Sequence, residues 1–429
     1  MSSDIQARLK RLRKAGRLSH RKKPRIPDAK KASPPPASTP AHDAPAGAGV
    51  ACLTELAGME EVAGEQGDYL LRTVRYPLTH QQGATCLNDL LALPEDAAFR
   101  LAEHPDFDFR SAIFLDTETS GLAGGAGTIV FLTGVGVFEE DGYVVRQFFA
   151  RNPAEEQAYL PDLARFIDER GGLITFNGRA FDWPLLRTRF ILSGVDPPNE
   201  QPHVDLLHPA RRLWRARLGA CNFGNLEQRI LGFYRSGLDI PSWMIPGMWF
   251  NFARGQGNVR EMESVLYHNL EDIVSMAPLA HAIAGVLSGQ LPPHPNDLPA
   301  LAKAWQRAGD AANAERAYRQ ALDAPLPPVL RAQALRELAL LLKRSGRLQE
   351  AAGFWQTWVM MHRPQDVEPL IELAKYHEWH TGDLAQARAH TLEALALATA
   401  WRAGQRRRDA LAELQHRLSR LERKLNSGQ

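Results

Sequence analysis

The 429-residue sequence contains little cysteine and no segment that predicts secretion. Its three cysteines, Cys52, Cys86 and Cys221, are odd in number and form no CxxC pair. This argues against a disulfide framework or a zinc ribbon and favours a reducing compartment. The N-terminus lacks the apolar run of about 7–15 residues of a signal peptide, and no window approaches the roughly 18 apolar residues of a membrane span. We therefore expect a soluble, cytoplasmic protein with no membrane partner.

The net charge is also small, +2, but it is unevenly distributed. Residues 1–31 hold twelve Lys or Arg against two Asp, so this segment carries +10 and the remaining chain carries −8. Residues 31–50 turn to Pro, Ala, Ser and Gly, a composition that buries too little apolar surface to order itself. We therefore predict that residues 1–50 are a basic, disordered tail and linker. The basic part is either a solubilising tail or an electrostatic arm for phosphate backbones.

The rest of the chain has a globular composition, with 44% hydrophobic and 23% charged residues, and it is long enough for more than one domain. Residues 51–290 mix segments typical of strands and of helices. The expected strands cover Ala112–Leu115, Thr128–Phe138, Tyr143–Phe149 and Leu173–Phe176. Helical patterns cover Glu155–Glu169 and Pro184–Ser193. This order predicts an α/β domain with a mixed sheet flanked by helices.

Residues 297–425 are almost purely helical in pattern and show a repeat. Gly309, Gly346 and Gly382 are 37 and 36 residues apart. An alanine lies five residues after each glycine, at Ala314, Ala351 and Ala387. The positions nine and twelve residues after the glycines are more variable, and they are Tyr318 and Ala321, Trp355 and Trp358, and Thr391 and Ala394. The pattern resembles tetratricopeptide repeats, with about three units over residues 297–400 and a capping helix over Gln405–Leu425. Such an all-α domain either binds a protein partner in a groove or is a structural appendage.

The sharpest local feature is an apolar run, Ile113-Phe114-Leu115, that leads directly into Asp116-Thr117-Glu118. Side chains at i and i+2 of a strand share a face, so Asp116 and Glu118 are expected to project together from its end. Two adjacent carboxylates repel each other unless a cation lies between them. Oxygen ligands suit Mg²⁺ or Mn²⁺. The alternative is a turn that merely ends the strand.

Two further stretches carry carboxylates. Asp182 follows a strand and turn and precedes a helical pattern, where it is either a functional carboxylate or a plain helix N-cap. His268 and Asp272 are four residues apart, so on a helix they share one face. That spacing puts an ionisable base beside a carboxylate. The alternative for this pair is an ordinary contact on a helix surface.

Together these stretches resemble the DEDD exonuclease superfamily, and residues 110–285 resemble its YprB-type ribonuclease-H-like domain. The matching motifs are Asp116-Thr117-Glu118, Asn177 with Phe181-Asp182, the segments His203–His208 and Leu226–Gly232, and the final helix with Asp272. Each motif alone is common, whereas the set in this order is specific. The resemblance implies that residues 51–290 form a ribonuclease-H-like exonuclease domain.

The resemblance also implies a two-metal hydrolysis of phosphodiester bonds. Four carboxylates would hold two Mg²⁺ or Mn²⁺ ions, and they are Asp116, Glu118, Asp182 and Asp272. His268 would take the proton of the attacking water. Related enzymes have Tyr four or His five residues before the last aspartate, whereas here His268 is at four and Tyr267 at five. The general base is therefore His268, with Tyr267 or neither as alternatives.

Other residues carry weaker signals. Asp205 is a possible additional ligand or a residue that shapes the site. An arginine run forms either a phosphate track or a solvated helix face, and its members are Arg211, Arg212, Arg215 and Arg217. Large aromatic residues either stack on unpaired bases or belong to the core or a lid, and they are Trp243, Trp249, Phe250 and Phe252.

We therefore expect a Mg²⁺- or Mn²⁺-dependent 3′–5′ exonuclease that acts on single-stranded RNA or DNA. Stacking and charge recognise both nucleic acids, so the sequence leaves the choice open. One alternative is a nucleic-acid-binding adaptor that cuts poorly and recruits protein partners through its helical repeats. The complete set of four acids argues against it. An endonuclease of the same fold is a third possibility, and the DxE spacing resembles the exonuclease arrangement more closely.

Overall fold

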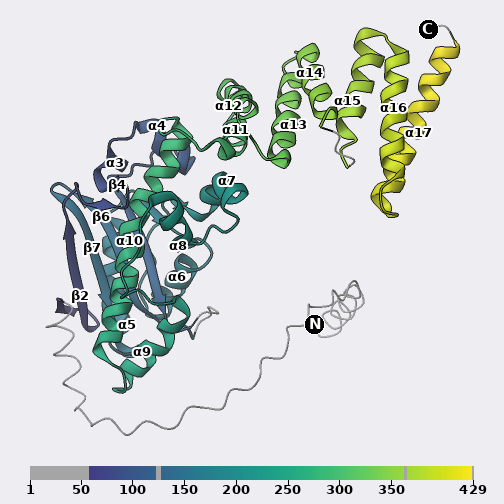
Figure 1. Cartoon of the computed structure of the whole chain (residues 1–429). Helices are drawn as coiled ribbons and strands as arrows, with labels where there is room; N and C mark the ends of the chain where they lie inside the picture. The colour runs from purple at the N-terminus through teal and green to yellow at the C-terminus, as the bar shows by residue number, and fades with distance from the viewer. Residues whose placement is uncertain (1–57, 122–126, 362–364, 428–429) are drawn as a thin grey trace, which may run out of the picture. The chain divides into compact units, whose positions relative to one another are not determined.

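The computed structural model describes residues 58–121, 127–361 and 365–427. The chain divides into two units, Met1–Ala44 and Pro45–Gln429, and all described residues belong to the second. All of the predicted tail and linker, residues 1–50, lies outside the described residues, as does Cys52. The second unit contains a sheet with its flanking helices, followed by a run of helices alone (Figure 1).

The described residues form a seven-stranded mixed sheet in the order β1-β2-β7-β6-β5-β8-β9. Its strands are β1 (Met59–Gly64), β2 (Gly67–Tyr76), β5 (Ala112–Thr119), β6 (Val130–Glu139), β7 (Gly142–Phe149), β8 (Gly172–Thr175) and β9 (His203–Asp205). Neighbours from β1 to β5 pair antiparallel, whereas β5, β8 and β9 pair parallel. The predicted mixed sheet is therefore confirmed. β3 (Gln81–Gln82) and β4 (Thr85–Cys86) form a separate small hairpin.

Helices cover both faces of this sheet. One face packs against α5 (Glu156–Asp168), α6 (Asp182–Leu192) and α9 (Ile245–Ala253). The other packs against α3 (Leu87–Leu91), α4 (Glu95–Ala102), α7 (Leu207–Leu218) and most of α10 (Val259–Ser288). In β5, Ile113 and Leu115 point into the first core, and Ala112 and Phe114 into the second. Strand alternation therefore directs Asp116 to the face that carries α10.

Helix α10 is long and apolar enough to span a membrane by length and composition, with a mean hydropathy of 1.4 in its most apolar window. This window contradicts the expectation from the sequence that no segment approaches the composition of a membrane span. In the structure 72% of the window is buried, and α10 runs along the sheet (Figure 1). A helix that is apolar over most of its circumference is typical of the core of a large domain as well as of a membrane span. Burial against the sheet accounts for the composition of α10.

The C-terminal region consists of helices that each pack on the next. They are α11 (Leu298–Arg307), α12 (Ala311–Asp323), α13 (Pro328–Arg344), α14 (Leu348–Val359), α15 (Glu368–Tyr376), α16 (Leu384–Thr399) and α17 (Gln405–Asn426). Gly309, Gly346 and Gly382 follow the first helix of each pair and have φ values of +80°, +76° and +71°. The nine residues at the repeated positions after these glycines are all buried. The helical repeat predicted from the glycine spacing is thus present as helix pairs.

Candidate metal centre

Three elements bring the predicted carboxylates together. β5 supplies Asp116 and Glu118, α6 begins at Asp182, and Asp272 lies on α10. Both the backbone N–H and the hydroxyl of Thr117 donate to Asp182 Oδ1, at 3.2 and 2.5 Å. Asp182 is therefore held against β5 and is not the N-cap of α6, a position that Phe181 occupies.

The approach of α10 to the sheet depends on two glycines in β6. A Cβ atom on Gly134 would lie 2.2 Å from Asn269 Oδ1, and one on Gly136 would lie 2.6 Å from Ile273 Cγ2. Asn269 is fully buried, and its Nδ2 donates to Asp116 Oδ2 at 3.0 Å. Its Oδ1 accepts from Gln147 Nε2 at 2.9 Å. Asn269 thus ties α10 to β5 and β7 and sets the position of its neighbours on the helix.

The four carboxylates are electrostatically strained in the absence of a cation. Burial raises the pKa of Asp116 well above its usual value, and the charges of Asp272, Asp182 and Glu118 raise it further. Burial also raises the pKa of Glu118, followed by repulsion from Asp272 and Asp182. The pKa of Asp182 is raised by burial too, against its bonds from Thr117. Buried oxygen donors that repel one another fit a divalent cation such as Mg²⁺ or Mn²⁺.

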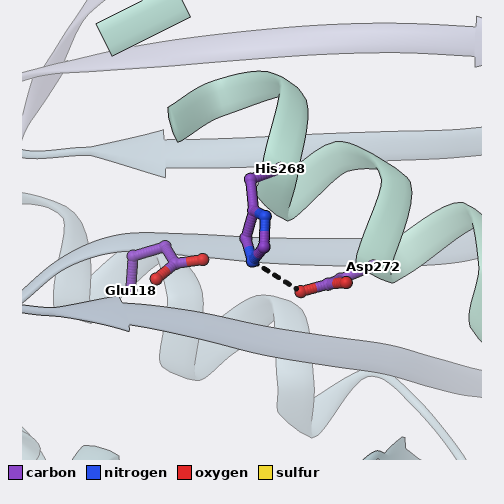
Figure 2. A group of neighbouring side chains, drawn as sticks. All are labelled: Glu118, His268 and Asp272. Carbon is purple, nitrogen blue, oxygen red and sulfur yellow. Dashed lines mark ion pairs between the residues drawn. The ribbon is translucent and has the colours of Figure 1, made fainter. Parts of the chain in front are cut away.

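A compact subset of this cluster includes His268. Ligand atoms of Glu118, His268 and Asp272 all lie within 4.8 Å of one another. In Figure 2 the His268 ring and the Asp272 carboxylate extend from α10 toward Glu118 on the strand below. His268 Nε2 is 3.5 Å from Asp272 Oδ2, as expected for residues four apart on a helix. The i,i+4 pair therefore faces the acidic cluster and not solvent.

The other nitrogen of His268 is held from outside the helix. Its Nδ1 donates to Asp239 Oδ1 at 2.7 Å, which leaves Nε2 as the proton acceptor of a neutral ring. The Ser242 hydroxyl lies 3.2 Å from Nε2. Tyr267, the alternative general base, points elsewhere: its hydroxyl accepts from the Ser236 backbone N–H at 2.9 Å. The structure therefore brings His268, and not Tyr267, into the cluster.

Arg235 is a cation inside this acidic site, and it was not predicted from the sequence. Its Nε donates to Glu227 at 2.8 Å, and its Nη2 donates to Asp272. Arg235 Nη1 lies 3.3 Å from Asp239 Oδ1. The side chain is 9% exposed, and the neighbouring carboxylates raise its pKa against the effect of burial. Arg235, Asp239 and Ser242 all lie between η2 (Glu227–Leu231) and α9, in a segment without long helices or strands.

Two cavities border the acidic cluster, and Asp272 lines both. The first, of about 510 Å³, is also lined by Asp116, Asn177, Arg211 and Arg215. Asn177 has a φ of +67°. The second, of about 520 Å³, is lined by His268, Arg235 and Tyr234, among others. The site is therefore open on two sides, and one side carries arginines.

The four arginines of the predicted run lie on α7 and have different surroundings. Arg211 and Arg215 line the first cavity, one turn apart on α7. Arg212 Nη1 instead lies 3.7 Å from Glu103 Oε1. Arg217 Nη2 forms an ion pair with the buried Asp297 carboxylate, at 2.9 Å from Oδ2. Only two of the four residues are therefore positioned for a phosphate track.

Asp205 binds backbone groups. Its Oδ1 accepts from the Asn177 N–H at 2.8 Å and from the Leu207 N–H at 3.1 Å. The Arg179 N–H lies 3.3 Å from Oδ2. The carboxylate is 1% exposed, and its bonds hold the turn that carries Asn177. Asp205 thus shapes one wall of the first cavity.

The four aromatic residues considered for base stacking differ in their exposure. Trp249 is fully buried, stacks on Phe131 and donates from Nε1 to Ala150 O at 2.9 Å. Phe250 and Phe252 are partly buried against the same core. Trp243, in η3 (Ser242–Met244), is 69% exposed and adjoins Ser242. Of the four, Trp243 is the one available for stacking.

Three residues of the site were not predicted from the sequence, although each is hydrogen-bonded to a predicted site residue: Asn269, Arg235 and Asp239. Asn269 adjoins His268 on the motif helix, so the motif itself carried a signal for it. Gly134 and Gly136, alternate residues of one strand, signalled a close approach by another element. Arg235 and Asp239 lie about 30 residues before the motif in an irregular segment, which has no spacing rule that fixes its position.

The mixed sheet and the acidic cluster are those of a ribonuclease-H-like domain of a nuclease superfamily. A family model described as RNase_H superfamily matches residues 113–284. The chain is 30% identical over 345 residues to the uncharacterized protein YprB of Bacillus subtilis (strain 168), a match that covers 78% of this chain and 82% of that protein. The chain therefore belongs to the YprB family.

A solved structure with local similarity is the family B DNA polymerase from the hyperthermophilic archaeon Pyrobaculum calidifontis. It is 14% identical, with a TM-score of 0.35, and the match covers 55% of this chain and 29% of the polymerase.

Proposed function

We propose that this protein is a divalent-metal-dependent 3′–5′ exonuclease that hydrolyses single-stranded nucleic acid. One observation carries the proposal: four carboxylates from β5, α6 and α10 converge, and the pKa values of Asp116, Glu118 and Asp182 are raised. A structural role for such a group is energetically unfavourable, because buried like charges repel. Perturbed carboxylates in a cleft are typical of functional sites.

In this proposal the four acids hold two Mg²⁺ or Mn²⁺ ions. When bound, the ions supply charge neutralisation at the phosphate and a lower pKa for the attacking water. His268 accepts the proton of that water at Nε2, because Asp239 keeps the proton of the ring on Nδ1. Asn269 orients the Asp116 carboxylate through its 3.0 Å bond to Oδ2.

The two cavities support a single strand as the substrate. Arg211 and Arg215 border the acids on one side, where guanidinium groups bind phosphate bidentately. Tyr234, 71% exposed, lines the cavity on the other side, and Trp243 is exposed nearby. Exposed rings stack on unpaired bases of either RNA or DNA. The proposed activity therefore extends to both single-stranded RNA and single-stranded DNA.

The helix pairs support a second role, recruitment of a protein partner. Stacked helix pairs form extended surfaces that are commonly used for binding. Met360 and Trp379 are large apolar side chains of this region that are more than half exposed. An adaptor that binds nucleic acid without cutting it is the form of this proposal that competes with the exonuclease.

The test is incubation of the purified protein with end-labelled single-stranded RNA and DNA in Mn²⁺, Mg²⁺ or EDTA. We expect metal-dependent shortening from the 3′ end that is lost in Asp116→Ala and Asp272→Ala. The exposed Asp196→Ala serves as the matched control and should cut normally. Tight binding without cleavage in any metal would reject the exonuclease and favour the adaptor.

A further inference from the structure

Arg235 contacts the metal-site carboxylate that α10 provides. Its Nη2 donates to Asp272 Oδ1, while Asp272 Oδ2 faces His268 Nε2 at 3.5 Å. Asp272 Oδ1 therefore already has a cationic partner within the protein. The guanidinium also binds both oxygens of Glu227, at 2.8 and 2.9 Å.

This arrangement puts a full positive charge where the proposed function needs a divalent ion to bind. Asp272 is one of the two acids that most strongly raise the pKa of Glu118, whereas the charge of Arg235 lowers it. Arg235 thus already offsets part of the repulsion that a metal ion would relieve. Two cations that share one carboxylate in a buried site repel each other strongly, because the effective dielectric constant there is low.

The Arg235 side chain also borders a cavity and has a second carboxylate partner, Glu227. It lines the cavity of about 520 Å³ beside His268, so its end can leave Asp272 without entering the protein core. Glu227 is buried and paired with Arg235 through two hydrogen bonds, which retain the guanidinium near the site when one contact is lost. The segment after Arg235 is fastened to α10 by the bond from the Ser236 N–H to Tyr267.

We infer that Arg235 is a built-in counter-cation that competes with the divalent metal for Asp272. The inference rests on the proposed metal-dependent function, and it means that Arg235 itself offsets part of the charge of the acidic cluster when no metal ion is bound. Metal binding then requires that the guanidinium leave Asp272 Oδ1. The metal affinity of the native protein is consequently lower than its carboxylates alone would give.

The experiment is a calorimetric titration of the full chain with Mn²⁺ in the absence of nucleic acid. Arg235→Met removes the charge and keeps much of the length, and Arg235→Gln removes the charge but keeps a donor for Glu227. We expect both variants to bind Mn²⁺ about tenfold more tightly or better, since a nearby unit charge is lost. Arg235→Lys should bind like the native protein. The control is Arg229→Met, an exposed arginine of η2.

The outcomes distinguish competition by Arg235 from metal binding by the acidic cluster itself. Tighter binding by the two neutral variants, with Arg229→Met unchanged, supports the competition. Equal or weaker binding by the neutral variants, with saturable binding by the native protein, overturns the competition and leaves the metal site standing. No saturable binding by any of the proteins would overturn both. The Gln variant preserves the comparison if the Met variant does not fold.

Discussion

At the scale of single residues, Asp116 combines a proposed metal-binding position with a cost to the fold. Its carboxylate is buried beside three other acids, and its pKa is raised by burial and by their charges. The native state therefore favours protonation of Asp116, and at neutral pH an ionised Asp116 destabilises the metal-free fold. Active sites commonly trade stability for function in this way.

We expect Asp116→Asn to stabilise the metal-free protein at neutral pH, because it removes a carboxylate whose ionisation is disfavoured by burial and by the neighbouring acids. The check is calorimetric unfolding in EDTA and again in Mn²⁺. Mn²⁺ should raise the melting temperature of the native protein and have little effect on the variant. The exposed Asp196→Asn is the control. A variant less stable than the native protein in EDTA would show that Asp116 is not under electrostatic strain.

His203 provides a prediction for the pH dependence of stability. Burial, followed by the nearby charge of Arg179, lowers the pKa of His203 to about 4, and its Nε2 lies 2.9 Å from Thr175 Oγ1. In the unfolded chain the pKa is about 6.5, so the unfolded state takes up the proton at higher pH. The stabilisation is therefore complete above about pH 6.5 and is lost as the pH falls toward 4.

Urea unfolding of the native protein and His203→Gln at about pH 7 and about pH 5 measures this effect. Between these values we expect the native protein to lose about 1–2 kcal/mol more than the variant, since the slope for one proton is at most about 1.4 kcal/mol per pH unit. Glutamine keeps a polar end for Thr175. Parallel losses in the two proteins would mean that His203 is protonated in the fold.

At the scale of elements, the packing of α10 on β6 positions the site. Gly134→Ala would put a Cβ atom 2.2 Å from Asn269 Oδ1, so either the helix or the Asn269 side chain must move. We expect a loss of about 1–3 kcal/mol, typical of overpacking in a core. We also expect weaker Mn²⁺ binding, because Asn269 holds Asp116. Urea unfolding and Mn²⁺ titration measure the two effects.

The matched control is Gly247→Ala in α9, where an added Cβ atom would meet nothing within 4 Å. Alanine is favoured over glycine inside a helix, so this variant should be as stable as the native protein or more stable. If Gly134→Ala behaves like this control, the close approach of α10 does not position the carboxylates.

The predicted elements succeeded where a periodic pattern was strong. The strands of the central sheet were placed within a few residues, because each has a continuous apolar run. β5 was expected over Ala112–Leu115 but continues to Thr119, since its last residues pair with β6 despite their polarity. β1, β2 and β9 were not predicted from the sequence. β1 and β9 are the edge strands, and β9 has only three residues. β2 lies between β1 and β7, and its sequence lacks a strict alternation of apolar and polar residues.

The acidic residues of the candidate site could be predicted from the sequence, whereas its cation, Arg235, could not. Asp116, Glu118 and Asp272 follow from local spacing on a strand and a helix. Arg235 and Asp239 reach His268 and Asp272 only because an irregular segment folds back over α10. That return depends on tertiary contacts, such as the Ser236 N–H to Tyr267, which no local pattern encodes.

At the scale of the molecule, the helical region is joined to the α/β region by buried charge. Arg217 at the end of α7 pairs with Asp297, which is 2% exposed and lies in η4 (Pro295–Asp297) just before α11. Burial raises the pKa of Asp297, against the effect of Arg217. Removal of one partner leaves a buried charge, which is costly. The arginine run noted in the sequence thus serves two regions, with Arg211 and Arg215 at the cavity and Arg217 at this junction.

The distribution of charge over the whole chain leads to the last prediction. Residues 1–31 carry +10 and the remainder carries −8, so the part that holds the acidic site repels nucleic acid at long range. If the basic segment is an electrostatic arm, its removal should reduce the salt dependence of single-strand binding, because each phosphate contact contributes about −0.7 to the slope of log K against log salt. If it is a solubilising tail, the slope should not change.

Binding of labelled single strands in EDTA over a range of salt distinguishes the two roles. The proteins are the full chain, a variant without residues 1–44, and a control without residues 32–44, which contain no Lys or Arg. The larger deletion ends where the first of the two units ends. We expect that deletion to lower the magnitude of the slope by about 3 or more, as for some five released contacts, and the control to match the full chain. Equal slopes for all three would assign phosphate binding to the cavity arginines alone.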